Sequence, residues 1–263
     1  MHQKDASLVY TSKLTGDCVV INQCDEEAYA EYPTENGTPA LWRKPLVSFA
    51  DANDPYIQNL PTLINDRHML PQDFLPHPTV VISCFFPFLQ EVANSNIGVE
   101  DNMPSVCWND AYGITNSMIG RLNNALTTFI RDRGYEAAVP EGVCMFQDIL
   151  MSNWSQRHLA YAAGMGTFGI NNMLITDSGC CGRLGSIVAN IPAVTTSHKT
   201  EENCLYKRDG SCSKCLKNCF SGALTSETFD RQTCHAMCDR NGTDSCGKCD
   251  TNIPCAFAVP GKA

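Results

Sequence analysis

Cysteines crowd into the C-terminal part of this sequence, and their number and spacing limit what the chain can fold into. The chain has 263 residues and 16 cysteines. In a reducing compartment, thiols at such a density serve as metal ligands or buried small hydrophobes rather than as a disulfide framework. The sequence therefore predicts a body of residues 1–199 and a separate module of residues 200–263. The module's cysteines are Cys204, Cys212, Cys215, Cys219, Cys234, Cys238, Cys246, Cys249 and Cys255.

The cysteine module repeats itself. The run Cys204-x7-Cys212-x2-Cys215-x3-Cys219 is echoed by Cys238-x7-Cys246-x2-Cys249-x5-Cys255. This pattern is typical of two-cluster ferredoxins, in which the last cysteine of one run crosses to the other 4Fe–4S cluster. We therefore expect one cluster to be held by Cys204, Cys212, Cys215 and Cys255. The other is expected on Cys219, Cys246, Cys249 and an eighth cysteine, for which internal spacing favours Cys238 and the FDRQTC stretch favours Cys234; we prefer Cys234.

The same thiols are compatible with two other uses, a zinc site and a set of disulfides. The pairs Cys212-x2-Cys215 and Cys246-x2-Cys249 are compatible with a four-cysteine zinc knuckle, but nine cysteines exceed the needs of one zinc ion. A disulfide-rich tail would require export, and the start MHQKDASLVYTSKL lacks the features of a signal peptide. The two-cluster interpretation is therefore preferred.

Charge and hydropathy restrict the partners. The formal net charge is -9. The body holds 11 basic residues (Lys and Arg) against 20 acidic ones (Asp and Glu), whereas the module holds 8 basic and 8 acidic residues. An acidic body would repel a phosphate backbone, so no nucleic-acid partner is expected. The longest apolar run, Thr79–Leu89, is about half of what a membrane span needs. We expect a cytoplasmic protein without a membrane partner.

The body alternates between strand-like and helix-like segments. Strands are predicted at Val80–Phe86, Tyr135–Val139, Met173–Thr176 and Ser186–Ala189. A helix is predicted at Asn116–Arg133, and another within SNWSQRHLAYAAG, capped by Ser152 or Asn153. The order favours an α/β sandwich around one sheet.

A glycine-rich loop follows the second of these helices. Its sequence GMGTFG matches G-x-G-x-x-G, but in a dinucleotide site the glycines open a helix after a strand. The glycines more plausibly let the backbone approach a large flat ligand or another chain segment. The candidate cofactor-binding residues are Gly164, Gly166, Thr167, Phe168 and Gly169.

Three cysteines of the body lie in segments whose structure can be predicted. Cys84 lies in an apolar run and is expected to be a packed core thiol. Cys180 and Cys181 follow Ser178 and Gly179 in a predicted turn. For this pair both packing and contact with a cofactor or redox partner stay open.

A family resemblance can now be stated. The run AYAAGMGTFGINNMLITDSGCCGRLGSIV (160–188), the preceding WSQRH and, more loosely, NDAYGITNSMIGRLNNAL, together with the double-cluster tail, resemble the epoxyqueuosine reductase family and its relatives, including reductive dehalogenases. The likeness runs from about residue 40 to the end. Within that superfamily the chain looks most similar to short members with a double 4Fe–4S domain.

The resemblance implies a fold and a chemistry. It implies a nitroreductase-like sandwich domain that can seat cobalamin, followed by a small two-cluster ferredoxin-like domain that relays electrons to the cobalt. The substrate would be a small molecule, and the electron donor a protein such as ferredoxin or flavodoxin. The candidates for a general acid are Asp148, Arg157, His158 and Tyr161, because they lie just before the glycine loop. For Arg157 and His158 a helix surface or a cap is the alternative.

The chain also departs from the family. Asp209 stands at the usual first cysteine position, Phe220 replaces a proline, and Pro254 precedes the last cysteine instead of following it. No helical-repeat tail follows Cys255, so tRNA is not the expected substrate. Two other functions stay open: an electron-transfer protein that uses flavin or no further cofactor, and a zinc-stabilised interaction module.

Overall fold

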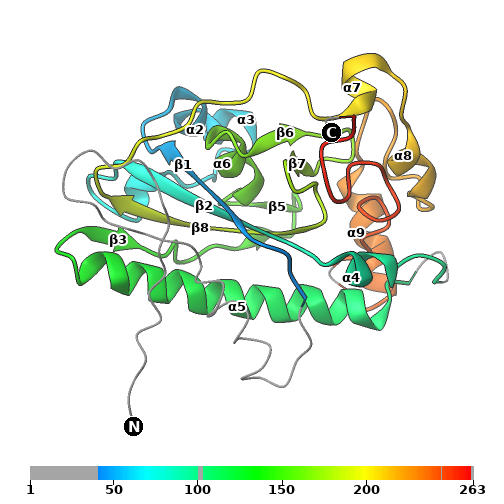
Figure 1. Cartoon of the computed structure of the whole chain (residues 1–263), viewed down its shortest axis with the longest axis horizontal. Coiled ribbons are helices and arrows are strands. Elements are labelled where there is room, and N and C mark those ends of the chain that lie inside the picture. Colours follow the sequence, from blue (N-terminus) through cyan, green and yellow to red (C-terminus); the bar gives the residue numbers. More distant parts are fainter. Residues whose placement is uncertain (1–40, 100–102, 244, 262–263) are drawn as a thin grey trace, which may run out of the picture.

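The computed structural model describes residues 41–99, 103–243 and 245–261, so that Cys18 and Cys24 lie outside the described residues. Its central sheet has four strands in the order β1-β2-β8-β3, and each neighbouring pair is antiparallel (Figure 1). The strands are β1 (Leu46–Asp51), β2 (Val80–Pro87), β3 (Glu136–Ala138) and β8 (Gly182–Asn190).

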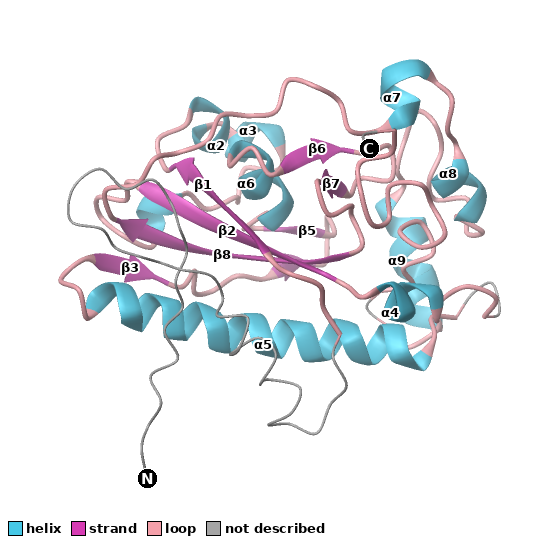
Figure 2. Ribbon diagram, in the orientation of Figure 1, coloured by secondary structure: helices cyan, strands magenta, loops and turns pink. Residues whose placement is uncertain are grey.

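Helices cover both faces of this sheet. The long helix α5 (Val106–Arg131) lies along one face, and α2 (Pro55–Gln58), α3 (Leu60–Leu63) and α6 (Gln156–Ala162) lie on the other (Figure 2). Every residue of β2 is buried, as expected for a strand with both faces covered. Ile187 joins the core under α5 while its neighbour Val188 joins the core under α6. The protein is therefore a layered mixed α/β structure.

Most of the predicted elements are present. The strand predictions near residues 80, 135, 173 and 186 are confirmed, and the predicted helix at 116–133 is the C-terminal part of α5. The helix begins earlier because Ser105 caps it by accepting a hydrogen bond from the Trp108 N–H at 3.0 Å.

The expected cap of the helix α6 was wrong. Its N-cap residue is Ser155 and not Ser152 or Asn153. Ser152 instead accepts from the Trp154 N–H, and Asn153 accepts from the Cys144 N–H and donates to the Gly142 carbonyl.

The strands also do not belong to one sheet. Two separate hairpins, β4 (Met145–Phe146) with β5 (Met151–Ser152) and β6 (Gly166–Phe168) with β7 (Leu174–Thr176), flank α6. The antiparallel hairpins arise because short turns join the paired strands.

The cysteine module packs against one end of the sheet and against the N-terminal end of α5 (Figure 1). It contains α7 (Leu205–Asp209), α8 (Lys214–Asn218) and α9 (Arg231–Arg240). The loop between Cys246 and Cys249 is anchored there: a Cβ on Gly247 would lie 2.2 Å from the Trp108 ring, and the Asn96 side chain donates to the Cys246 carbonyl at 2.8 Å. Asn96 lies just after α4 (Gln90–Asn94). The division at residue 200 stays a prediction, as does the ferredoxin-like character of the module.

The remaining described helical segment is a short 3₁₀ turn at Pro71–Asp73. None of the helices in the described part of the chain combines the length and the apolar character that a membrane span needs.

Candidate functional site

Four cysteines line one cavity in the C-terminal module, and we call this set the first cysteine group: Cys204, Cys212, Cys215 and Cys255. Apolar side chains such as Ile170 and Ile253 complete the wall of this cavity. These are the four residues that the spacing assigned to one cluster. The fold therefore brings Cys255 to the same cavity as three cysteines that come much earlier in the sequence.

The first cysteine group is chemically suited to a thiolate-bound cluster. Burial, together with the nearby Cys255 and Cys204, raises the pKa of Cys215 to about 12. Without a cation the thiol would stay protonated near neutral pH. A cluster or metal ion that takes the place of the thiol protons would supply positive charge and stabilise the thiolates, as is usual for cysteine ligands.

A second set of cysteines lies around the start of α9, and we call it the second cysteine group: Cys219, Cys234, Cys246 and Cys249. Burial raises the pKa of Cys249 far above its usual range, and Asp250 and Cys246 add to the shift. The Cys246 thiol has a raised pKa because Cys238 hydrogen-bonds to it and because it is buried.

The position of Cys238 bears on the eighth ligand. It lies one helical turn after Cys234 on α9 and makes thiol contacts with Cys234 and Cys246. Cys234 reaches further, because its electrostatic neighbours include Cys246 and Cys219, and it also influences Cys249. Cys238 contacts Cys246 directly, whereas Cys234 interacts with more members of the group, so the choice of Cys234 as the eighth ligand stays a prediction.

The described residues contain no group of three or more His, Cys, Asp or Glu side chains that could hold a metal ion as they stand. A cubane differs from a single ion, because its thiolates bind separate corners of a cluster. The first cysteine group surrounds a cavity and fits this wider arrangement.

Cys180 and Cys181 lie beside the first cysteine group. Both are buried, and their backbone N–H groups donate to the carbonyls of Cys255 and Ala256 at 3.0 Å. The Cys180 thiol also hydrogen-bonds to Cys255, which raises the pKa of Cys180 and lowers that of Cys255. Cys84, in contrast, is packed in the core of the sheet as expected.

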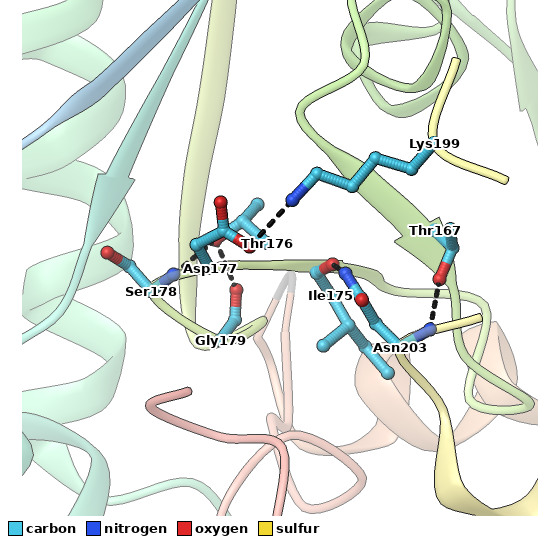
Figure 3. A network of polar contacts seen from close by, with 8 residues as sticks. All are labelled: Thr167, Ile175, Thr176, Asp177, Ser178, Gly179, Lys199 and Asn203. Carbon is cyan, nitrogen blue, oxygen red and sulfur yellow. Dashed lines mark hydrogen bonds and ion pairs between the residues drawn. The ribbon is translucent and has the colours of Figure 1, made fainter. Parts of the chain in front are cut away.

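A hydrogen-bond network ties this region to the β6–β7 hairpin (Figure 3). The Asn203 N–H donates to the Thr167 hydroxyl at 2.8 Å, and the Asn203 side chain donates to the Ile175 carbonyl at 2.7 Å. The Thr176 hydroxyl donates to the Gly179 carbonyl at 2.8 Å. The network therefore holds Asn203, which precedes Cys204, and Gly179, which precedes Cys180, on the same hairpin.

The candidate catalytic residues of α6 lie in an aromatic cluster. His158 and Tyr161 both contact Phe168, with ring centroids 4.8 and 5.6 Å apart. Tyr56 and His198 complete the cluster, at 5.0 and 4.9 Å from the Tyr161 ring. The sequence analysis missed Tyr56 and His198, because they come from α2 and from the segment after β8 and carry no motif.

Several groups in this cluster have displaced pKa values. Burial, together with the nearby Arg157, lowers the pKa of His158 to about 4. His158 is therefore neutral at pH 7, and its Nδ1 lies 2.7 Å from the Ser155 hydroxyl. Burial, with Tyr161 nearby, raises the pKa of Tyr56 to about 12. These neutral groups can hold or donate a proton.

Arg157 links the aromatic cluster to the cysteine module. Its side chain is exposed and donates to the Asn172 carbonyl at 2.6 Å. Asp250 and Cys249 are among its electrostatic neighbours. Asp250 is buried, and burial raises its pKa to about 7. Arg157 therefore lies within electrostatic reach of Cys249 in the second cysteine group.

The glycine loop packs against its own chain. A Cβ on Gly164 would lie 2.3 Å from the Ser197 carbonyl oxygen, and one on Gly166 would lie 2.2 Å from the Ile175 carbonyl oxygen. A Cβ on Gly169 would meet the Asn171 side chain at 2.5 Å. Of the two roles considered for these glycines, the structure thus shows close approach of another chain segment. Cofactor binding by the loop stays a prediction.

Asp148 lies apart from the other catalytic candidates. It is on the exposed turn between β4 and β5 and forms an ion pair with Arg67 at 2.8 Å. The hydrogen bond from Arg67 lowers the pKa of Asp148. None of its described contacts joins it to His158 or Tyr161.

Comparisons with known proteins identify the fold. No protein-family model and no curated protein matches the chain. Among solved structures it is similar to a selenomethionine-labelled epoxyqueuosine reductase, with a TM-score of 0.53 and 18% identity over 89% of this chain and 67% of that one. It is similar to epoxyqueuosine reductase from Bacillus subtilis, with a TM-score of 0.52 and 16% identity over 90% of this chain and 66% of that one.

A reductive dehalogenase shares the fold as well. The catabolic reductive dehalogenase NpRdhA has a TM-score of 0.54 and 12% identity over 96% of this chain and 34% of that one. The chain thus spans about two thirds of the epoxyqueuosine reductases and one third of the dehalogenase. The expected likeness to these proteins is confirmed for the fold.

A further epoxyqueuosine reductase structure contains a tRNA stem loop, at a TM-score of 0.46. A likeness at that level does not bear on the partners of this chain. The absence of a nucleic-acid partner stays a prediction from the acidic body.

Proposed function

We propose that this protein is an iron–sulfur oxidoreductase in which eight cysteines bind two 4Fe–4S clusters. The observation that carries the proposal is the cavity lined by Cys204, Cys212, Cys215 and Cys255. These residues are spread over the module, yet they enclose one space, and thiolates are the ligands that such clusters use. The fold shared with epoxyqueuosine reductase and reductive dehalogenase is in keeping with a reductase.

The second cluster would lie on Cys219, Cys234, Cys246 and Cys249, with Cys234 as the eighth ligand. Its place next to Arg157 supports a direction of electron flow, from the first cysteine group through the second to an acceptor near α6. A bound cluster supplies one-electron redox chemistry. The protein's own part would be to exclude water from the thiolates and to offer protons from Tyr161 or His158.

The acceptor near α6 has two candidates. The first is cobalamin in a nitroreductase-like domain, acting on a small-molecule substrate. The glycine loop does not add support for it, because chain carbonyls fill the space beside Gly164 and Gly166. That observation favours the second candidate, an electron-transfer protein that uses flavin or no further cofactor.

Metal analysis of protein purified without oxygen, after growth with cobalamin, tests the proposal. About eight irons per chain are expected, with one cobalt if cobalamin is the acceptor and none if it is not. Flavin would be visible in the absorption spectrum. Zinc without iron would contradict the proposal and favour the interaction module.

A matched pair of variants sharpens this experiment. Cys212→Ser should lose about half of the iron, because one of two clusters loses a ligand. Cys107→Ser, at an exposed cysteine on α5, should keep all of it. Equal iron in both variants would show that the first cysteine group holds no cluster.

A further inference from the structure

The outer wall of the first cysteine group is strongly basic. Leu205 and Tyr206 of α7 and Cys215 of α8 line the cavity, so both of these short helices border it. Their other side chains include the exposed cations Lys207, Arg208, Lys214 and Lys217. Asp209 is the one acidic residue in the sequence from 203 to 218.

This basic face stands out against the rest of the molecule. The chain carries a formal net charge of -9, and most of its acidic residues lie in the body. Arg208 is engaged by the chain itself, because it donates to the Pro260 carbonyl at 2.9 Å. In the part of the chain that the structure describes, no hydrogen bond or ion pair engages the ammonium groups of Lys207, Lys214 and Lys217. These three lysines are therefore available to a partner.

The position of the basic face relative to the two cysteine groups suits a site at which electrons enter. Cys249 of the second cysteine group lies within electrostatic reach of Arg157 on α6. The first cysteine group is covered on its outside by α7 and α8, which project from the end of the molecule opposite β3 (Figure 1). Electrons entering from outside would reach the first cysteine group before the second.

We propose that α7 and α8 form the docking face for an acidic electron-carrier protein that reduces the cluster of the first cysteine group. The inference rests on the proposed function and adds the entry point and the charge of the partner. In each encounter the carrier would lose one electron and the cluster would gain it, with no bond made or broken. A positive face on an acidic protein orients such a partner and speeds its association, and this effect weakens as salt is added.

The test measures the rate of electron transfer by stopped-flow mixing. Reduced plant-type 2Fe–2S ferredoxin, an acidic protein, is mixed with the oxidised, iron-loaded full chain at low ionic strength. We compare the wild type with Lys214→Glu/Lys217→Glu and with the single variant Lys207→Glu on the other helix. The control is Arg121→Glu/Arg133→Glu, which makes the same change in net charge at exposed positions of α5 and of the turn after it.

We expect the double lysine variant to react about tenfold or more slowly, and Lys207→Glu to show a smaller loss. The wild-type rate should fall with salt and approach that of the variants near 1 M, where the Debye length is about 3 Å. The arginine control should stay close to the wild type. Photoreduced deazaflavin, an uncharged small reductant, should reduce all the proteins equally.

Two results would overturn the inference while leaving the proposed function intact. One is equal rates for the lysine variants and the wild type with all clusters present. The other is a wild-type rate that does not depend on salt. A chain that binds no iron would overturn the proposed function itself, and this inference with it.

Discussion

The backbone N–H of Cys180 donates to the carbonyl oxygen of Cys255 at 3.0 Å, so a turn of the α/β body and the last cysteine of the module are held together. The next residues repeat the pattern, with Cys181 donating to Ala256. The first cysteine group is therefore assembled on the body and is not confined to the module. Changes in the body should accordingly affect the cluster.

Gly179→Ala should weaken this junction. Gly179 has a φ of +82°, and an added Cβ would lie 2.3 Å from the Ala256 carbonyl oxygen. The variant must shift the segment that carries Cys255, so we expect a lower iron content and a loss of about 2 kcal/mol or more in the free energy of unfolding. Urea unfolding and iron analysis measure these two effects.

Gly222→Ala is the matched control. Gly222 also has a positive φ of +73°, but nothing lies within 4 Å of its added Cβ. The control should lose only the cost of the backbone conformation, about 1 kcal/mol. Equal losses in the two variants would show that the contact with Ala256 is not tight.

Arg43 should prove to be a second tie between body and module. Its guanidinium donates to the carbonyls of Phe88, Ser178 and Phe257. Arg43→Gln cannot reach all three, so we expect a loss of about 2 to 3 kcal/mol in unfolding free energy, measured by urea titration. Arg133→Gln, which removes an exposed hydrogen bond to the Phe129 carbonyl four residues earlier, should change stability by less than about 0.5 kcal/mol. Similar small losses for both would argue against the tie.

The eighth cluster ligand can be decided by two serine variants. Cys234→Ser should lose about half of the iron, because Cys234 neighbours Cys219, Cys246 and Cys249. Cys238→Ser should keep both clusters, because the proposed ligand set contains Cys234 and not Cys238, although Cys238 contacts Cys234 and Cys246. The reverse outcome in iron analysis and electron paramagnetic resonance would assign the ligand to Cys238.

His158 should make stability depend on pH. Its pKa is lowered to about 4 from its usual value near 6.5, so between these values the unfolded chain binds more protons than the folded chain. Stability should therefore be fully present above about pH 6.5 and fall as the pH drops toward 4. The loss between pH 7 and pH 5 should be about 1 to 2 kcal/mol smaller in His158→Gln than in the wild type. Unfolding titrations at the two pH values check this, and an equal pH dependence in both proteins would contradict it.

The main strands and the long helix could be predicted from the sequence, because they depend on local patterns of apolar residues. The apolar run around Ile82 and the periodic helix around Ile119 predicted β2 and α5. The spacing of Cys204, Cys212 and Cys215 predicted one wall of the cavity.

Features that depend on distant segments could not be predicted in the same way. The contact of Cys180 with Cys255 joins residues that have no common motif. His198 joins Tyr161 only because the segment after β8 crosses α6. The cap of α6 was misplaced because Asn153, a good capping residue, is used instead to hold the loop at Cys144 and Gly142.

The return of Cys255 to the turn at Cys180 has a consequence for how the protein matures. Cys255 lies 51 positions after Cys204, so the first cysteine group closes a long loop and cannot form until synthesis has passed Cys255. Closing such a loop has an entropic cost that a bound cluster would offset. Cluster delivery would then follow synthesis of the whole module, and a chain truncated before Cys255 would carry an open, reactive set of thiols.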